Sequence, residues 1–270
     1  MKINIGIIGG SGIYSLEKLK LIKRVKPKTK YGDPSDFVEI YEFSKGRYLA
    51  FLPRHGKKHL IPPHKIPYKA NLAALKSLGV RFVISTAVVG SLKSTIHPGD
   101  VVIPNQFIDL TWGRDDYFDY DKKIIHLPMA YPYCESLRKL IYSLSKKNKF
   151  IVHKNGTIVV IQGPRFATRA ESAWFIKQGW DIINMTQYPE NYFARELGLC
   201  YASICTVTDY DSNIKKQINI STEEMGNVLK VFHKNIEKTK KLLIDIVLNY
   251  NFEELRCNCN MSILGDLYHR

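Results

Sequence analysis

Residues 68–85 read YKANLAALKSLGVRFVIS, and the pattern changes from helix to strand within this stretch. We expect a helix over residues 68–78 that ends at Gly79, because glycine is common just after a helix. The apolar run over residues 80–85 is typical of a buried strand. Helices and strands that alternate along a chain build α/β domains, so this stretch predicts that fold class.

The same alternation extends on both sides of this stretch. Residues 3–8 form a short apolar run, and residues 37–43 and 48–52 have the pattern of a hairpin. The remaining patterns predict strands over 100–108, 157–161 and 199–207, and helices over 131–147 and 169–178. A fold of this kind places the carboxyl ends of several strands at one edge of a sheet, where ligands bind.

No linker, repeat or break in composition divides the chain. We therefore expect a single domain over residues 1–270, in which 45% apolar residues are enough for a sizeable core. Its longest helix is expected over about 221–249, where apolar residues recur on one face. A Cys-x-Cys tail over 250–270 follows that helix.

The formal net charge is +15, which attracts anions of several kinds. The densest basic run, Lys18–Lys30, is interpreted as a solvated surface segment, because no nucleic-acid-binding motif accompanies it. A basic nucleic-acid-binding protein without catalysis is a distant alternative. The chain shows neither the pattern of a signal peptide nor an apolar run long enough for a membrane helix, so we expect a cytoplasmic protein with no membrane partner.

Five cysteines occur, and two of them, Cys257 and Cys259, lie close together near the end of the sequence. Two thiols alone are too few for a structural zinc site. A local redox pair, a link to another part of the fold and two inert thiols all remain open. Cys134, Cys200 and Cys205 are interpreted as buried free thiols.

Four strand ends carry side chains suited to an oxyanion. Ser11 stands in a glycine-rich turn that fits neither a dinucleotide fingerprint nor a P-loop. Arg54 offers the planar pair of donors that suits phosphate, and His55 beside it is expected to add a donor. Thr86 and Thr186 supply hydroxyls at two further strand ends. Together these turns predict a site for free phosphate.

Asp209 and Asp211 flank Tyr210 at another strand end. Two carboxylates at this spacing can begin a turn, accept hydrogen bonds from a ligand amine or bind a metal. No histidine or cysteine cluster stands beside them in the sequence, so a metal is not expected there.

Several long motifs resemble the methylthioadenosine phosphorylases of the trimeric purine nucleoside phosphorylase superfamily. These motifs are GIIGGSGIY, FLPRHGKKHLIPPHKIPYKANLAALKSLGV, VVGSLKSTIHPGDVVIPNQFIDLTWGR, IQGPRFATRAES, INMTQYPE and LCYASICTVTDYD. The resemblance implies a single-domain α/β fold with a twisted mixed sheet, or distorted barrel, surrounded by helices. It also implies a homotrimer or homohexamer.

The resemblance assigns roles by position. The residues matching its phosphate site are Ser11, Arg54, His55, Thr86, Ala87 and Thr186. The residues matching its nucleoside site are Phe166, Ala167, Met185, Asp209, Asp211, His126, Met225 and Leu229. Phe166 is implied to stack on the base, Met185 to lie under the ribose, and His126 to reach a neighbouring subunit's site.

The implied reaction is phosphorolysis of a purine nucleoside, with Asp209 as the group that assists the leaving base. Inorganic phosphate is the co-substrate, and no cofactor or metal is expected. Asp209 accepts hydrogen bonds and Ala167 offers no carboxylate for an N1–H, so both positions favour adenine over a 6-oxopurine. S-methyl-5′-thioadenosine is the expected substrate, and a 6-oxopurine or broad-specificity enzyme is the alternative.

Overall fold

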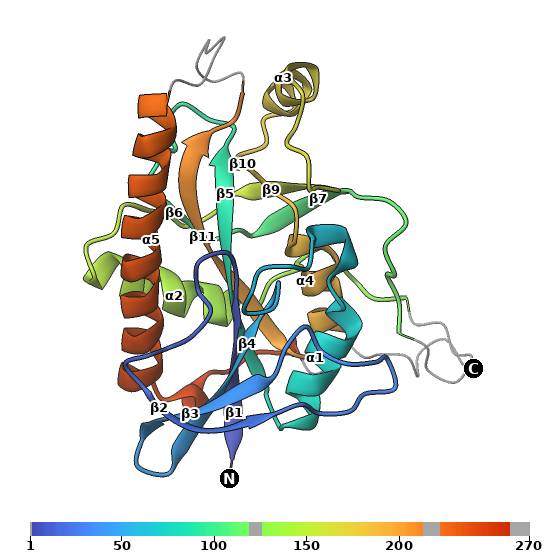
Figure 1. Ribbon diagram of the computed structural model, residues 1–270, viewed down its shortest axis with the longest axis vertical. Helices are drawn as coiled ribbons and strands as arrows, with labels where there is room; N and C mark the ends of the chain where they lie inside the picture. Colours follow the sequence, from blue (N-terminus) through green and yellow to red (C-terminus); the bar gives the residue numbers. More distant parts are fainter. Residues whose placement is uncertain (1, 119–125, 213–221, 260–270) are drawn as a thin grey trace.

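The computed structural model describes residues 2–118, 126–212 and 222–259. In this part of the chain, eleven strands form one mixed sheet, with helices on both of its faces (Figure 1). The expected fold class is confirmed. The strand order runs from β2 to β7 and branches at β5, so over the described residues the sheet is open and not a closed barrel.

Strand β5 (Phe82–Ser91) is the centre of the sheet and follows the quoted helix, α1 (Tyr68–Ser77). It pairs in parallel with β1 (Ile3–Gly9) and β11 (Cys200–Tyr210), and antiparallel with β10 (Ile182–Asn184). Since β1, β5 and β11 are parallel, their carboxyl ends point the same way. The strands that complete the sheet are β2 (Lys20–Val25), β3 (Val38–Ser44), β4 (Arg47–Pro53), β6 (Val101–Val102), β7 (Gln106–Leu110), β8 (Val152–His153) and β9 (Thr157–Ile161).

Two apolar cores lie on opposite faces of the sheet. Along β1, Ile7 packs into the core shared with α5 (Thr222–Asn249) and α2 (Glu135–Lys147), whereas Ile8 packs into the core shared with α1. Successive side chains of a strand point to opposite faces, and β1 is apolar on both because both are covered. Figure 1 shows α5 alongside β11 and the helices α1 and α4 (Gln187–Glu196) on the other side of the sheet.

The remaining described helices are short. They are α3 (Arg169–Lys177) and the 3₁₀ turns Pro63–Lys65 and Phe252–Glu254. Thr168 and Glu171 form a capping box at the start of α3. None of the described helices combines the length and the apolar character that a membrane span requires.

One expectation about strands was wrong, and one strand was not expected. The basic run Lys18–Lys30 is exposed over Lys20–Arg24, as expected of a surface segment, and it contains the edge strand β2. Lysines suit such an edge because they discourage pairing with another chain. The single strand expected over 100–108 is divided into β6 and β7, on either side of Pro104, which has no N–H to donate to a ladder.

Candidate active site

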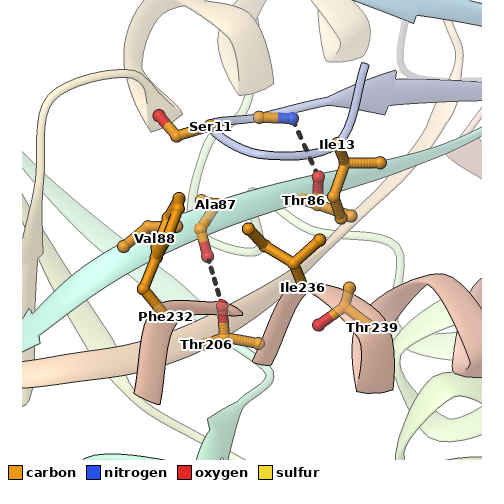
Figure 2. Close-up of a pocket in the computed structure, with 10 residues that line it drawn as sticks. Ser11, Ile13, Thr86, Ala87, Val88, Thr206, Phe232, Ile236 and Thr239 are labelled. Carbon is orange, nitrogen blue, oxygen red and sulfur yellow. Dashed lines mark hydrogen bonds between the residues drawn. The ribbon is translucent and has the colours of Figure 1, made fainter. Parts of the chain in front are cut away.

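A small pocket opens between the turn after β1, strand β5, strand β11 and helix α5 (Figure 2). Sequence reasoning singled out three of its lining residues, Ser11, Thr86 and Ala87. The other lining residues are Gly10, Ile13, Val88, Thr206, Phe232, Ile236 and Thr239.

The turn after β1 is fixed by close packing on both sides. The Gly10 N–H donates to Thr86 Oγ1 over 2.9 Å. A Cβ at Gly10 would lie 2.4 Å from the Thr86 carbonyl oxygen, and one at Gly12 would lie 2.2 Å from Ile236 of α5. Gly12 also has a positive φ of 86°. Glycine is therefore required where β5 and α5 approach this turn.

Arg54 follows β4, is 1% exposed, and is paired with a carboxylate. Its Nε and Nη2 donate to the two oxygens of Glu190 over 2.6 and 2.8 Å. Its Nη1 donates to the Thr86 carbonyl over 2.9 Å, and would lie 2.9 Å from a Cβ at Gly10. The expected pair of donors for phosphate is thus occupied by Glu190. What remains for an anion is the second hydrogen of Nη1, beside the turn that carries Ser11.

His55 is buried, and the pKa of its imidazole is lowered to about 4 by burial and by the charge of Arg54. The ring is therefore neutral at pH 7. Its Nδ1 lies 2.8 Å from the Ile61 carbonyl oxygen, which can only accept, so Nδ1 carries the proton. This leaves Nε2 as an acceptor. The expectation that His55 adds a donor is corrected by this tautomer.

Asp209 reaches the pocket's side of the sheet because β11 has a bulge. Thr206 pairs with Val88, but the register then shifts by one residue, so Asp209 pairs with Gly90. Val88 and Gly90 lie on the same face of β5, and their partners therefore share that face too. Asp209 Oδ2 lies beside Gly90, at 3.8 Å from the position of a Cβ there, which is an ordinary van der Waals distance.

The two carboxyl groups lie in surroundings that favour their neutral forms. Burial raises the pKa of Asp209, with a further increase from the charge of Asp211, while a hydrogen bond from Thr208 over 2.5 Å opposes the shift. Burial also raises the pKa of Asp211. Oδ2 of Asp211 is buried, and the neighbouring Ser172 hydroxyl, which opposes the rise in this pKa, lies outside hydrogen-bonding geometry among the described residues. A buried acceptor of this kind is costly unless a ligand supplies a donor.

Arg114 links the loops expected to hold the sugar and the base. Its guanidinium donates to the carbonyl oxygens of Gln162, Met185 and Tyr188 over 2.9, 3.0 and 2.5 Å. Met185 is half-buried and packs so closely on Gly163 that a Cβ there would lie 2.6 Å from its sulfur. This clamp fixes the loop before α3 against the loop before α4.

The loop before α3 presents an aromatic ring to solvent. Phe166 is 81% exposed, whereas Ala167 packs partly against the core beside it. An exposed phenyl ring of this kind has a free face for a flat ligand. Thr186 is buried at the start of α4, where the Asn184 amide bonds its hydroxyl over 3.4 Å.

Of the expected site residues, Ser11, Thr86 and Ala87 line the pocket, and three others lie outside the groups described above. His126 lies on an exposed segment, and Leu229 on α5 is 52% exposed. Met225 belongs to the first turn of α5, but its side chain lies outside the described residues. The described residues of one chain therefore do not show the expected 5′-substituent pocket.

Sequence reasoning missed the residues that hold others in place. Glu190 was visible only as the end of a motif, yet it also accepts hydrogen bonds from Ser85 and Tyr201. Thr239 lines the pocket with a buried hydroxyl that has no partner among the described residues. A polar residue on the apolar stripe of a predicted helix was the available signal for Thr239.

Comparison with known proteins shows the family of the chain. The model of the phosphorylase superfamily matches residues 4–248. S-methyl-5′-thioadenosine phosphorylase of Nitrosopumilus maritimus is 45% identical over 261 residues, which are 97% of each chain. The enzyme of the same name from Pyrococcus horikoshii is 48% identical over 255 residues, 94% of this chain and 95% of that one.

Among solved structures, methylthioadenosine phosphorylase from Schistosoma mansoni in complex with adenine superposes with a TM-score of 0.88. It is 34% identical, and the match covers 98% of each chain. With the family model matched over most of its length and relatives near half identity, this chain belongs to the phosphorylase superfamily.

Proposed function

We propose that this protein cleaves S-methyl-5′-thioadenosine with inorganic phosphate, giving adenine and 5-methylthioribose 1-phosphate. The observation that carries the proposal is the pair of partly buried carboxyl groups at the end of β11, the strand that also lines the oxyanion pocket: Asp209 lies in β11 and Asp211 follows it. The names of the curated relatives support the same substrate. They do not favour the 6-oxopurine alternative.

Phosphate is the nucleophile in this proposal. The Ser11 hydroxyl, the free hydrogen on Arg54 Nη1 and the Thr239 hydroxyl are the groups available to hold it in the pocket. Thr86 braces the turn, since its hydroxyl already accepts the Gly10 N–H. Fixed donors that position a nucleophile can lower a barrier by roughly 7–11 kcal/mol.

The base departs as the sugar–nitrogen bond breaks and phosphate bonds to C1′. Electron density moves into the purine, and a proton at N7 stabilises the leaving group. A raised pKa lets the Asp209 carboxyl hold that proton and donate it. The buried oxygen of Asp211 can accept a hydrogen from the 6-amino group, which a 6-oxopurine lacks. No metal and no redox cofactor takes part in this scheme.

A substrate panel tests the proposal. Purified protein is given methylthioadenosine, adenosine, inosine or guanosine, with and without phosphate, and free base is measured. We expect methylthioadenosine to be cleaved fastest and only with phosphate. Inosine as the fastest substrate would replace this function by the 6-oxopurine alternative, and no base release from any of them would leave phosphorolysis without support.

Variants test the role of Asp209. We expect Asp209→Asn to lower kcat about 10²–10⁴-fold, because the amide cannot donate a proton as an acid does. Asp109→Asn, on the exposed part of β7, is the matched control and should keep full activity. Unchanged turnover in Asp209→Asn would remove this residue from the mechanism.

The homotrimer or homohexamer, the role of His126 in a neighbouring site and the cytoplasmic location are part of the same proposal. They rest on resemblance to the family, and the exposed position of His126 is compatible with a partner's reach.

A further inference from the structure

Four cysteines from three separate parts of the chain lie together, at the core that the sheet shares with α2 and α5. Cys134 precedes α2, Cys200 begins β11, and Cys257 and Cys259 follow the 3₁₀ turn Phe252–Glu254. Their four sulfur atoms all lie within 4.8 Å of one another. The Cys-x-Cys pair, too small a ligand set by itself, is thus completed by two residues more than 50 positions earlier in the sequence.

The sulfurs are close enough together to share a central ion. Tetrahedral zinc with bonds of about 2.3 Å needs sulfurs about 3.8 Å apart, and all four lie within 4.8 Å of one another. The Cys200 and Cys257 sulfurs are 2.9 Å apart, which is longer than the roughly 2.05 Å of a disulfide and shorter than the zinc spacing, so this pair must separate by about 0.9 Å when an ion binds. Cys134 is in hydrogen-bonding range of both Cys200 and Cys259, so its contacts are not limited to one partner cysteine. The cluster is a tetrad and not two separate pairs.

The surroundings of the cluster are those of a closed structural site. Cys134, Cys200 and Cys259 are at most 5% exposed. Arg195 faces Cys259, and its Nε is buried with no hydrogen-bond partner among the described residues. A guanidinium N–H beside a sulfur offsets the negative charge that four thiolates leave after binding a divalent ion.

The tail that carries Cys257 and Cys259 is held in place independently. Ser136 Oγ donates to the Arg256 carbonyl over 2.6 Å, beside the first turn of α2. The ring of Phe252 lies 5.4 Å from that of Phe82 in β5 and is 2% exposed. These contacts hold the two cysteines against Cys134 and Cys200, so the ligand set is formed by the fold itself.

We propose that Cys134, Cys200, Cys257 and Cys259 bind one structural Zn²⁺ ion per chain. Four thiolates select a soft or borderline ion, and four protein ligands leave no open position for a catalytic water. Each thiol loses its proton on binding, so four protons are released for each ion and no electron is transferred. The ion ties the segment after α5 to β11 and α2. This site is separate from the phosphorolysis site and does not depend on the function proposed above.

Metal content and cobalt spectra test the site. The full chain, purified anaerobically without chelator, should hold about one zinc per chain by elemental mass spectrometry. After chelator treatment, Co²⁺ should restore the site and give the thiolate-to-cobalt charge transfer and strong visible bands of a tetrahedral sulfur site. Cys257→Ser and Cys259→Ser should lose the zinc.

Cys205→Ser is the matched control, because Cys205 is buried on β11 but contacts Ser203 and stands outside the tetrad. It should keep zinc and give the same cobalt spectrum. Three results would overturn the proposal: five free thiols without stoichiometric metal, disulfides among the four cysteines in the anaerobic protein, or an octahedral cobalt spectrum. Because the cobalt experiment uses the unaltered chain, misfolding of a serine variant cannot hide the outcome.

Discussion

At the scale of single residues, the centre of the site is a charge pair and not an isolated cation. Arg54 and Glu190 are both fully buried, and Ser85 and Tyr201 saturate the carboxylate. Each charge is tolerated in the interior because the other is present. The arginine thereby becomes a rigid support beside the turn at Gly10.

Removing the negative charge of Glu190 should therefore lower the stability of the fold. We expect Glu190→Gln to lower the free energy of unfolding by about 3–5 kcal/mol, since Arg54 would keep a buried, uncompensated charge. Thermal and chemical denaturation measure it. Glu253→Gln is the control, because it breaks an exposed pair with Lys2 and should change stability little. Equal effects of the two substitutions would contradict the role given to the buried pair.

His55 should make stability depend on pH. Folding holds its pKa near 4, whereas in the unfolded chain it returns to about 6.5, so protonation favours unfolding. Its contribution is complete above pH 6.5 and is lost as pH falls toward 4. This predicts a loss of about 2 kcal/mol between pH 7 and pH 5. Denaturant titrations should show a smaller loss in His55→Gln, whereas His233→Gln, at an exposed position on α5, should match the original protein.

Residue types at strand ends could be found in the sequence, but their pairing could not. Ser11, Thr86 and the Asp209–Asp211 pair were singled out because hydroxyls and carboxylates at such turns suit ligands. The use of the Arg54 donors was not predictable, since Glu190 lies 136 positions away and only the fold brings it close. The tautomer of His55 likewise depends on a carbonyl that the sequence does not locate.

At the scale of elements, long periodic segments were predicted well. Strand β9 has the predicted bounds, and α5 begins within one residue of the expected position. Local features were the weak point: the bulge that turns Asp209 toward the site leaves no mark in the apolar pattern of β11. The edge strand β2 was missed because the pattern of charge on its exposed residues is also that of a loop.

The turn after β1 should tolerate no side chain at Gly10. In Gly10→Ala, the methyl group would meet the Thr86 carbonyl at 2.4 Å, so the turn must shift away from β5. We expect kcat/KM for phosphate to fall about 100-fold, as displacements near 1 Å in a site can cause. Gly226→Ala on α5 is the control: a Cβ there meets nothing within 4 Å, and activity should be unchanged.

At the scale of the whole molecule, exposed aromatic rings mark a surface that another chain can cover. Trp112, Tyr117 and Tyr131 are 74%, 59% and 82% exposed, and His126 lies between the last two in the chain. Apolar surface of this kind is common at interfaces. It supports the proposed oligomer.

We expect light scattering to give the mass of a trimer or hexamer of the 31.1 kDa chain, and a monomer would contradict the proposal. Oligomers that contain two different variant chains then test whether His126 acts in the site of a neighbouring chain. His126→Ala and Asp209→Asn chains should each be impaired alone, but co-expression should restore activity, because a His126→Ala site can take its histidine from the other chain. No restoration would mean that His126 acts within its own chain or not at all.

The neutral, Nδ1-protonated ring of His55 has a consequence for discrimination between anions. Any oxyanion that comes to lie against Nε2 must carry a hydrogen to donate to its lone pair. Phosphate and arsenate keep one at neutral pH, whereas sulfate has none. We therefore predict that an anion in contact with this ring is phosphate or arsenate and not sulfate.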